Sequence, residues 1–272
     1  MALLKYADMP KSTFYYCLQK LSRQDKYKDL KEKIRSIFEA NHARYGYRRI
    51  TIELKKQGTV VNHKLVSKLM KQMELHARVS KKRYHSYRGD VGKTAPNLIN
   101  RDFYAEAPNQ KWATDVSEFS IGAGKLYLSP ILDMFNGEIV SYHIGESPNL
   151  QQTISMLDIA LQLRNTNGTL IHSDQGWQYQ SGSYQRLISE AGMTQSMSRK
   201  GNCLDNAMME NFFGIIKTEM FYGYEKTFPS LEALKLAIVE YIEYYNYKRI
   251  KLRLNGMSPV EFREYFQKMQ LD

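Results

Sequence analysis

The sequence predicts an α/β fold: a mixed five-stranded sheet with flanking helices, preceded by a small all-α domain that resembles a helix-turn-helix. Three observations support this fold class. Apolar residues recur at helical spacing between residues 27 and 76. Three strand candidates then follow one another with only short turns between them, as antiparallel hairpins do. Two later strand candidates each follow a helix candidate, as the crossover connections of parallel strands require.

The charge is distributed unevenly between the two parts. The whole chain has 272 residues and a formal net charge of +11. Residues 1–101 hold 24 Lys and Arg against 8 Asp and Glu, whereas residues 102–272 hold 15 against 20. Residues 1–101 are therefore expected to bind a polyanion, and nucleic acid is the obvious candidate. An anionic membrane surface is the alternative, but no long amphipathic helix or lipidation signal supports it.

Targeting signals and cysteine chemistry are both missing from the sequence. No stretch reaches about 18 apolar residues, and no signal peptide precedes the first helix candidate. Cys17 and Cys203 have neither metal-binding spacing nor a disulfide framework. We therefore expect a cytoplasmic protein with no membrane partner.

The basic part predicts three successive helices after a short helix that could begin near Ser12. The first covers residues 27–41, with apolar residues at positions 30, 34, 37 and 38. The second covers 47–57 and stops at Gly58, and the third begins at Asn62, a favourable N-cap residue, and ends near Leu75. Two short helices joined by a tight turn with glycine form a helix-turn-helix outline.

The third of these helices has a basic face. Lys64, Lys68 and Lys71 follow one another at i, i+4 and i+7, while Leu65, Leu69, Met70 and Met73 are expected to face inward. Such a helix could lie in the major groove of DNA. Lysines on a solvated helix face are the alternative.

Residues 77–104 form a basic linker with little periodicity. Tyr84 and Tyr87 are interleaved with the basic residues, so the segment could follow a phosphate backbone. A plain solvated linker is the alternative.

The second part alternates between strands and helices. Strands are predicted at 110–119, 125–133, 138–144, 168–173 and 193–197, and helices at 150–164, 181–191, 205–221, 230–247 and 258–268. Pro130 falls inside an interior strand, where proline removes a ladder hydrogen bond, so we expect a bulge or irregular pairing there. Ser258, Pro259 and Glu261 fit the N-cap, N1 and N3 positions of a capping box.

Three carboxylates are the strongest chemical signal. Asp115 lies in a strand flanked by apolar residues, where an unpaired carboxylate is costly. Asp174 ends an apolar strand and precedes Gln175 and Gly176, and Glu210 lies at the edge of the apolar stripe of a helix. Oxygen ligands on separate elements suit Mg²⁺, and two ions can hold both oxygens of a phosphoryl displacement. An aspartate on a solvated strand face and another in a turn are the alternatives.

The sequence motifs around these three carboxylates resemble those of a known family. Asp174 and Glu210 have 35 residues between them, as in the D,D(35)E signature of retroviral integrases and many transposases. Five short motifs resemble those of the protein encoded by the second open reading frame of bacterial insertion sequences of the IS3 family. These motifs are Trp112-x-Thr114-Asp115, His172-Ser173-Asp174-Gln175-Gly176, Gly201-Asn202-Cys203-x-Asp205-Asn206-Ala207, Glu210-Asn211-Phe212-Phe213 and Ser258-Pro259.

The resemblance implies an RNase H-like catalytic core that cuts and joins DNA ends. Asp115, Asp174 and Glu210 would bind two Mg²⁺ ions, or Mn²⁺, without a covalent enzyme intermediate. The implied organisation is an N-terminal segment (1–26), a basic DNA-binding domain (27–76), a linker (77–104), the core (105–225) and a C-terminal helical extension (226–272). Double-stranded DNA, further copies of the chain and an upstream-frame DNA-binding protein are the implied partners.

Other residues are assigned more simply. Lys217 shares the angular position of Glu210, and the superfamily often has a lysine at this offset, so it could hold a DNA phosphate. Arg199 and Lys200 precede the helix in a short basic loop and are further candidate DNA contacts. Asp205 is expected to cap that helix. His172 is expected to be a core histidine, although it could also orient a carboxylate or contact phosphate.

Two other functions stay open from the sequence alone. A catalytically inactive DNA-binding remnant or regulator of transposition would keep the basic part without the chemistry. An RNase H-like nuclease acting on RNA–DNA hybrids would use the same carboxylates.

Overall fold

The computed structural model describes residues 10–22, 25–78, 94–199 and 202–270. The chain divides into two compact units, residues 1–77 and residues 78–272. Each unit is described by itself below.

The first unit is helical, as predicted. Its helices are α2 (Lys11–Ser22), α3 (Lys28–Ala40), α4 (Tyr47–Lys56) and α5 (His63–Gln72). Gly58 follows α4 with a φ of +77°, a conformation that favours glycine. Asn62 caps α5 by accepting the Lys64 backbone N–H at 2.8 Å. The turn between α4 and α5 thus begins and ends at the predicted residues.

The faces of α5 separate apolar from basic residues. Val66, Leu69 and Met70 are buried, whereas Leu65 and Met73, which the sequence also predicts to face inward, are only partly buried. The lysines at positions 64, 68 and 71 are exposed. The predicted basic stripe is therefore on the surface of the unit.

A mixed sheet forms the centre of the second unit. Its strands are β1 (Lys111–Thr114), β2 (Ser117–Ile121), β3 (Gly124–Asp133), β4 (Ile139–Gly145), β5 (Leu170–Ser173) and β6 (Thr194–Met197). β3 pairs antiparallel with β1, β2 and β4, whereas β5 pairs parallel with β1 and β6. β1 and β2 are two halves of the single strand predicted at 110–119, because both pair with β3 in one continuous register.

Pro130 explains where that strand is interrupted. The Met134 N–H donates to the Lys111 carbonyl at 2.9 Å, and hydrogen-bonded pairs alternate along an antiparallel ladder. The N–H of residue 130 would therefore face the Asp115 carbonyl, and proline has none. On its other side β3 has a register shift between Ile131 and Leu132. The predicted irregularity near Pro130 is confirmed.

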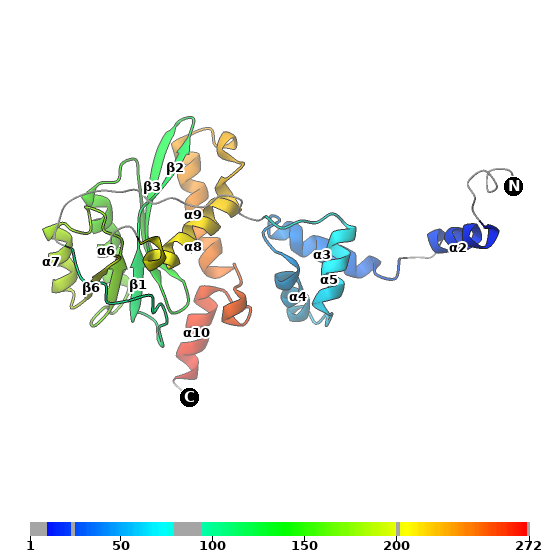
Figure 1. The fold of residues 1–272 in the computed structure, drawn as a ribbon, viewed down its shortest axis with the longest axis horizontal. Coiled ribbons are helices and arrows are strands. Elements are labelled where there is room, and N and C mark those ends of the chain that lie inside the picture. The colour runs from blue at the N-terminus through cyan, green and yellow to red at the C-terminus, as the bar shows by residue number, and fades with distance from the viewer. Residues whose placement is uncertain (1–9, 23–24, 79–93, 200–201, 271–272) are drawn as a thin grey trace. The chain divides into compact units, whose positions relative to one another are not determined.

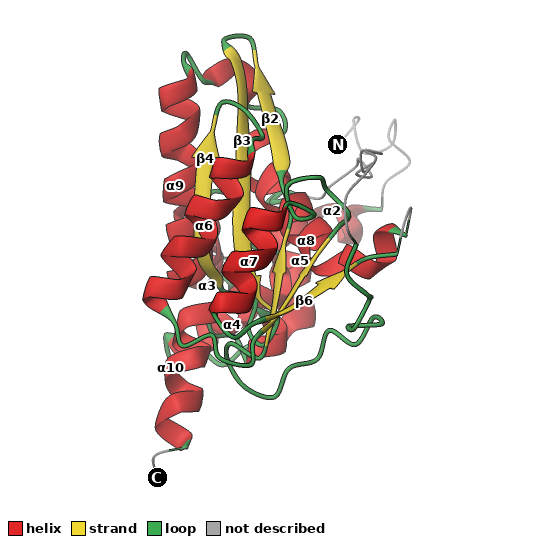
Figure 2. Cartoon of the chain, turned by 90° about the vertical axis from the view of Figure 1, so that its left-hand side faces the viewer, coloured by secondary structure: helices red, strands yellow, loops and turns green. Residues whose placement is uncertain are grey.

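Helices cover both faces of the sheet (Figures 1 and 2). α6 (Leu150–Leu163) and α7 (Gly182–Glu190) pack on one face, and α8 (Ala207–Ile216) and α9 (Leu231–Tyr247) pack on the other. Side chains alternate along β1, so that Trp112 joins the core under α6 and α7 and Ala113 joins the core under α8 and α9. The result is a three-layer α/β unit, as predicted.

The helix that begins with α8 continues through a π-helical turn, η2 (Lys217–Phe221). A buried ion pair fixes this turn to the end of α9. The single N–H at Arg249 Nε is shared between the two oxygens of the Glu219 carboxylate, at 2.9 and 3.1 Å, and Nη2 donates to Oε1 at 2.6 Å. The Tyr241 hydroxyl donates to the same carboxylate at 2.8 Å.

The C-terminal residues belong to the same core. Ile238, Tyr241 and Tyr245 of α9 are buried with Phe212 of α8 in one apolar cluster. α10 (Pro259–Met269) begins with the predicted capping box at Ser258. Short 3-10 turns complete the connections: η1 (Cys203–Asn206), η3 (Glu225–Thr227) and η4 (Leu252–Leu254).

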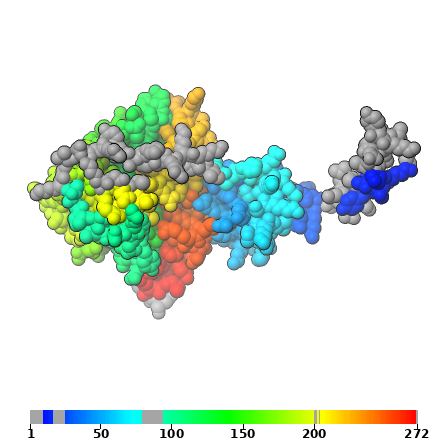
Figure 3. Space-filling view, viewed as in Figure 1, coloured from blue at the N-terminus to red at the C-terminus, as the bar shows by residue number. Residues whose placement is uncertain are grey.

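Residues 94–104, predicted as the end of a linker, run along the sheet edge. Ile99 is buried, and the Met197 N–H of β6 donates to the Pro96 carbonyl. Figure 3 shows the blue-green surface of this segment beside the yellow surface at the start of α8. Among the described residues, no helix is both long and apolar enough to cross a membrane.

Candidate active site

Two of the predicted carboxylates stand at the ends of neighbouring parallel strands. Ala113 of β1 is in register with His172 of β5, so Asp115 and Asp174 each follow two residues later. The Asp115 carboxylate is buried, with Oδ1 accepting the Val116 N–H at 2.7 Å. The carboxyl ends of parallel strands are where α/β sheets place site residues. The pairing of β1 with β5 thus sets the two aspartates side by side.

A tight turn fixes Asp174. Its Oδ1 accepts the Gly176 N–H at 2.8 Å. A Cβ atom at position 176 would lie 2.9 Å from that same oxygen, closer than real Cβ contacts allow. A side chain at position 176 would therefore force the Asp174 carboxylate to move, although the φ of Gly176 is not in the left-handed region.

The third carboxylate comes from α8. Met209, Phe212, Phe213 and Ile216 are buried against the sheet, and Glu210 is half-buried beside them. This is the edge position that the sequence predicts. Within the described part of the chain, the Glu210 carboxylate has no hydrogen-bond or ion-pair partner.

Electrostatics indicate that the three carboxylates are neighbours. Burial raises the pKa of Asp115 well above its ordinary value, and the charges of Asp174 and Glu210 raise it further. Burial also raises the pKa of Asp174 and of Glu210. Across the described ranges, however, no three His, Cys, Asp or Glu side chains converge closely enough to hold one ion. Asp115 is therefore affected by the charges of Asp174 and Glu210, but the three side chains do not form a closed cage.

Sequence reasoning missed Asn206, which contacts this group directly. Its Nδ2 donates to the Asp115 Oδ2 at 3.0 Å, and both side chains are buried. Asn206 closes η1, four residues before Glu210. Its place in the family motif Gly201–Ala207 was the only sequence signal that could have identified it.

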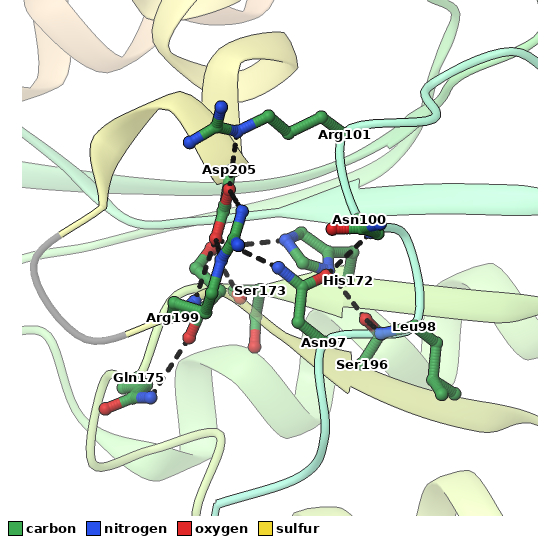
Figure 4. A network of polar contacts seen from close by, with 11 residues as sticks. Asn97, Leu98, Asn100, Arg101, His172, Ser173, Gln175, Ser196, Arg199 and Asp205 are labelled. Atoms are coloured by element: carbon green, nitrogen blue, oxygen red, sulfur yellow. Dashed lines mark hydrogen bonds and ion pairs between the residues drawn. The ribbon is translucent and has the colours of Figure 1, made fainter.

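Asp205 does not cap the helix, so that prediction is wrong. Its buried carboxylate accepts hydrogen bonds from the side chains of Arg199, Arg101 and Asn97 at 2.9–3.1 Å (Figure 4). It also accepts the Arg199 backbone N–H at 3.0 Å. The hydrogen bonds from Arg199 and then from Arg101 hold the pKa of Asp205 well below the ordinary range. Asp205 therefore ties the segment before β1 to the loop before α8.

The remaining predicted DNA contacts occupy different environments. Arg199 is about half exposed, but its Nε and Nη2 donate hydrogen bonds to Asp205. Lys200 lies outside the described residues. Lys217 is buried, with its ammonium 5.1 Å from the centre of the Phe119 ring, and burial lowers its pKa while the charges of Glu118 and Asp115 raise it. Lys217 thus lies beside the carboxylate group and not on an open helix face.

His172 is a core histidine, as expected. It is fully buried, and one ring nitrogen contacts the Ser196 hydroxyl at 2.9 Å (Figure 4). The other contacts the Ser198 hydroxyl at 3.1 Å. Burial lowers its pKa to about 4, so the ring is neutral near pH 7. It joins β5 to β6 beneath the site and cannot contact phosphate from there.

Comparisons with known proteins match both units. The integrase core domain family matches residues 105–203 and 210–266, and an HTH-like domain family matches residues 25–83. The catalytic core of HTLV-2 integrase, solved in complex with magnesium, covers 58% of this chain and 98% of its own, with 22% identity and a TM-score of 0.47.

Insertion-sequence proteins match nearly the whole chain. The InsK protein of insertion sequence element IS150 from Escherichia coli (strain K12) is 52% identical over 96% of this chain and 92% of its own length. The transposase of IS904 from Lactococcus lactis is 38% identical over 87% of this chain and 94% of its own. The transposase InsF of IS3A from Escherichia coli (strain K12) is 32% identical over 96% and 92%. The chain therefore belongs to the IS3 family of insertion-sequence transposases, enzymes of DNA transposition with an integrase catalytic core.

Proposed function

We propose that this chain cuts insertion-sequence ends and joins them to target DNA by in-line phosphoryl transfer, with Asp115, Asp174 and Glu210 as ligands of two Mg²⁺ ions. Mn²⁺ would suit the same oxygen ligands. One observation carries the proposal: Asp115 and Asp174 end neighbouring parallel strands, where Asp115 also senses the charge of Glu210.

The donor set suits hard cations. An ionised carboxylate offers about four lone-pair sites. Asp115 uses one hydrogen bond on each oxygen, and Asp174 uses one on Oδ1, so both keep lone pairs for an ion. A cation would also remove the repulsion that raises the pKa of Asp115. When bound, the ions activate the attacking water or DNA 3′-hydroxyl and stabilise the leaving oxygen.

The chain's own part is positioning. β1 and β5 hold two carboxylates in register, and the buried aromatic residues of α8 anchor the third against the sheet. Because these elements are packed in the core, little reorganisation accompanies binding of the reacting groups.

DNA contacts are proposed in both units. Lys64, Lys68 and Lys71 form an exposed basic face on α5 that suits a major groove. Arg199 and Lys200 precede α8, and Lys217 would act from beside the carboxylates. We further propose that the active complex contains several copies of the chain, that an upstream-frame protein can supply end recognition, and that the reaction takes place in the bacterial cytoplasm.

Asp174→Asn tests the assignment. The assay is Mg²⁺-dependent joining of short DNA with a free 3′-hydroxyl to supercoiled plasmid. Asp174→Asn should abolish joining and leave DNA binding unchanged, because amide oxygen is a poorer ligand without charge. Joining by the variant at the normal rate would refute the ligand role of Asp174.

The same assay separates the alternatives. A chain that binds DNA without joining, even when fused to the upstream frame, would be an inactive remnant. Cleavage of RNA–DNA hybrids in preference to duplex DNA would indicate a nuclease.

A further inference from the structure

The buried side-chain amide of Asn206 connects Asp115 to α8, the helix that carries Glu210. Asn206 is 5% exposed and Asp115 is 8% exposed, and the Asn206 Nδ2 lies 3.0 Å from the Asp115 Oδ2. Asn206 also directly precedes α8, so it is one helical turn before Glu210. A displacement of α8 would therefore be felt at Asp115 through this single hydrogen bond.

The other half of the amide is unused. The Asn206 Oδ1 is buried and has no hydrogen-bond partner among the described residues. Leaving a buried acceptor unsatisfied costs about 1–3 kcal/mol, and native structures have few such atoms. The Asn206 side chain therefore has an acceptor beside Asp115 that a donor arriving with a ligand would satisfy.

The backbone around Asn206 cannot easily shift to satisfy that oxygen from within the chain. The preceding residue, Asp205, is held by the side chains of Arg199, Arg101 and Asn97. The residues that follow enter α8, whose Met209 and Phe212 are fully packed. Asn206 is therefore fixed from both sides in the chain.

We propose that Asn206 is a positioning residue of the metal site. Its nitrogen holds the Asp115 carboxylate in the orientation that meets the ion, and its free oxygen accepts a hydrogen bond from water that enters with the ion. This inference rests on the proposed ligand role of Asp115. Partners of this kind fix the direction of a ligand's lone pairs, and their loss typically weakens metal affinity about 10- to 100-fold.

The test measures Mn²⁺ binding to the full chain by electron paramagnetic resonance. Asn206→Leu keeps a similar size and removes both the donor and the acceptor. It should weaken Mn²⁺ binding about 10- to 100-fold. In the joining assay it should raise the Mg²⁺ concentration for half-maximal rate, with most of the rate recovered at saturating metal. Asn211→Ala, an exposed asparagine on α8, serves as the matched control and should bind normally.

The outcomes are distinct. Folded Asn206→Leu with unchanged Mn²⁺ affinity would overturn the inference, provided that Asp115→Asn loses binding in the same titration. Unchanged binding by Asp115→Asn would instead overturn the ligand assignment under the proposed function. If circular dichroism shows that Asn206→Leu is unfolded, Asn206→Ala replaces it with the same expected and refuting results.

Discussion

The buried pair between Glu219 and Arg249 should be an important contributor to the stability of the second unit. Glu219→Gln removes the negative charge and keeps the shape of the side chain. Arg249 is 4% exposed and would be left charged, without a partner charge, in the core. Breaking a buried pair in this way costs about 3–5 kcal/mol, a large fraction of the roughly 5–15 kcal/mol that stabilises a typical protein.

The structure sharpens the expected magnitude. Gln can still accept from Arg249 through one oxygen, but three charge-assisted contacts at 2.6–3.1 Å cannot all be kept. Because Gln keeps one of these hydrogen bonds, the free energy of unfolding should fall by about 3 kcal/mol, the lower limit of that range. With a urea m-value of roughly 2 kcal/mol per M, the unfolding midpoint should fall by about 1.5 M.

The assay is equilibrium urea unfolding followed by tryptophan fluorescence, since Trp112 is buried in this unit. Glu118→Gln, which breaks an exposed pair with Lys125, is the control and should leave the midpoint nearly unchanged. The combined variant Glu219→Leu with Arg249→Met should regain much of the loss, because no unpaired charge remains. If Glu219→Gln unfolds at the same midpoint as Glu118→Gln, the ion pair does not stabilise the packing of η2 against α9.

Two further predictions concern the site. Gly176→Ala places a Cβ 2.9 Å from the Asp174 Oδ1 and should slow DNA joining roughly tenfold or more by displacing that carboxylate, whereas Gly182→Ala, with open space around it, should not; equal joining rates would refute the close-approach argument. His172 has a pKa of about 4 against an ordinary 6.5, so the unfolded chain binds more protons between these values. Stability should therefore fall by roughly 3 kcal/mol as the pH decreases from 6.5 to 4, and His172→Gln should lose that part of the pH dependence in urea titrations.

Periodicity and turn chemistry predict the order of the helices and strands, although the strand predicted at 110–119 is divided into β1 and β2 and the helix predicted at 205–221 into η1, α8 and η2. Gly58, Asn62 and Ser258 determine element ends through local backbone chemistry, and each lies where the sequence places it. The strand and helix order of the second unit follows from the same local signals. Pro130 even predicts the irregular part of the sheet, because the missing N–H is a property of the residue itself.

Contacts between distant segments could not be predicted in this way. Asp205 has the sequence signature of a cap, but the side chains of Asn97 and Arg101 donate to its carboxylate instead. The angular position of Lys217 follows from helical geometry, whereas its burial depends on Phe119 of β2. Asn206 pairs with a residue 91 positions earlier, so its role appears only once the sheet is assembled.

Pro130 shows how a position can serve a site by omitting an atom. An ordinary residue there would offer its amide hydrogen to the Asp115 carbonyl, and β1 and β2 would join in one unbroken ladder across the aspartate. The first carboxylate would then share the regular pleat of a strand interior. A proline, which has no polar side chain, can therefore affect the backbone position of a carboxylate on the neighbouring strand. Replacing Pro130 would restore an amide hydrogen opposite the Asp115 carbonyl, at a position that a search for polar residues would not select.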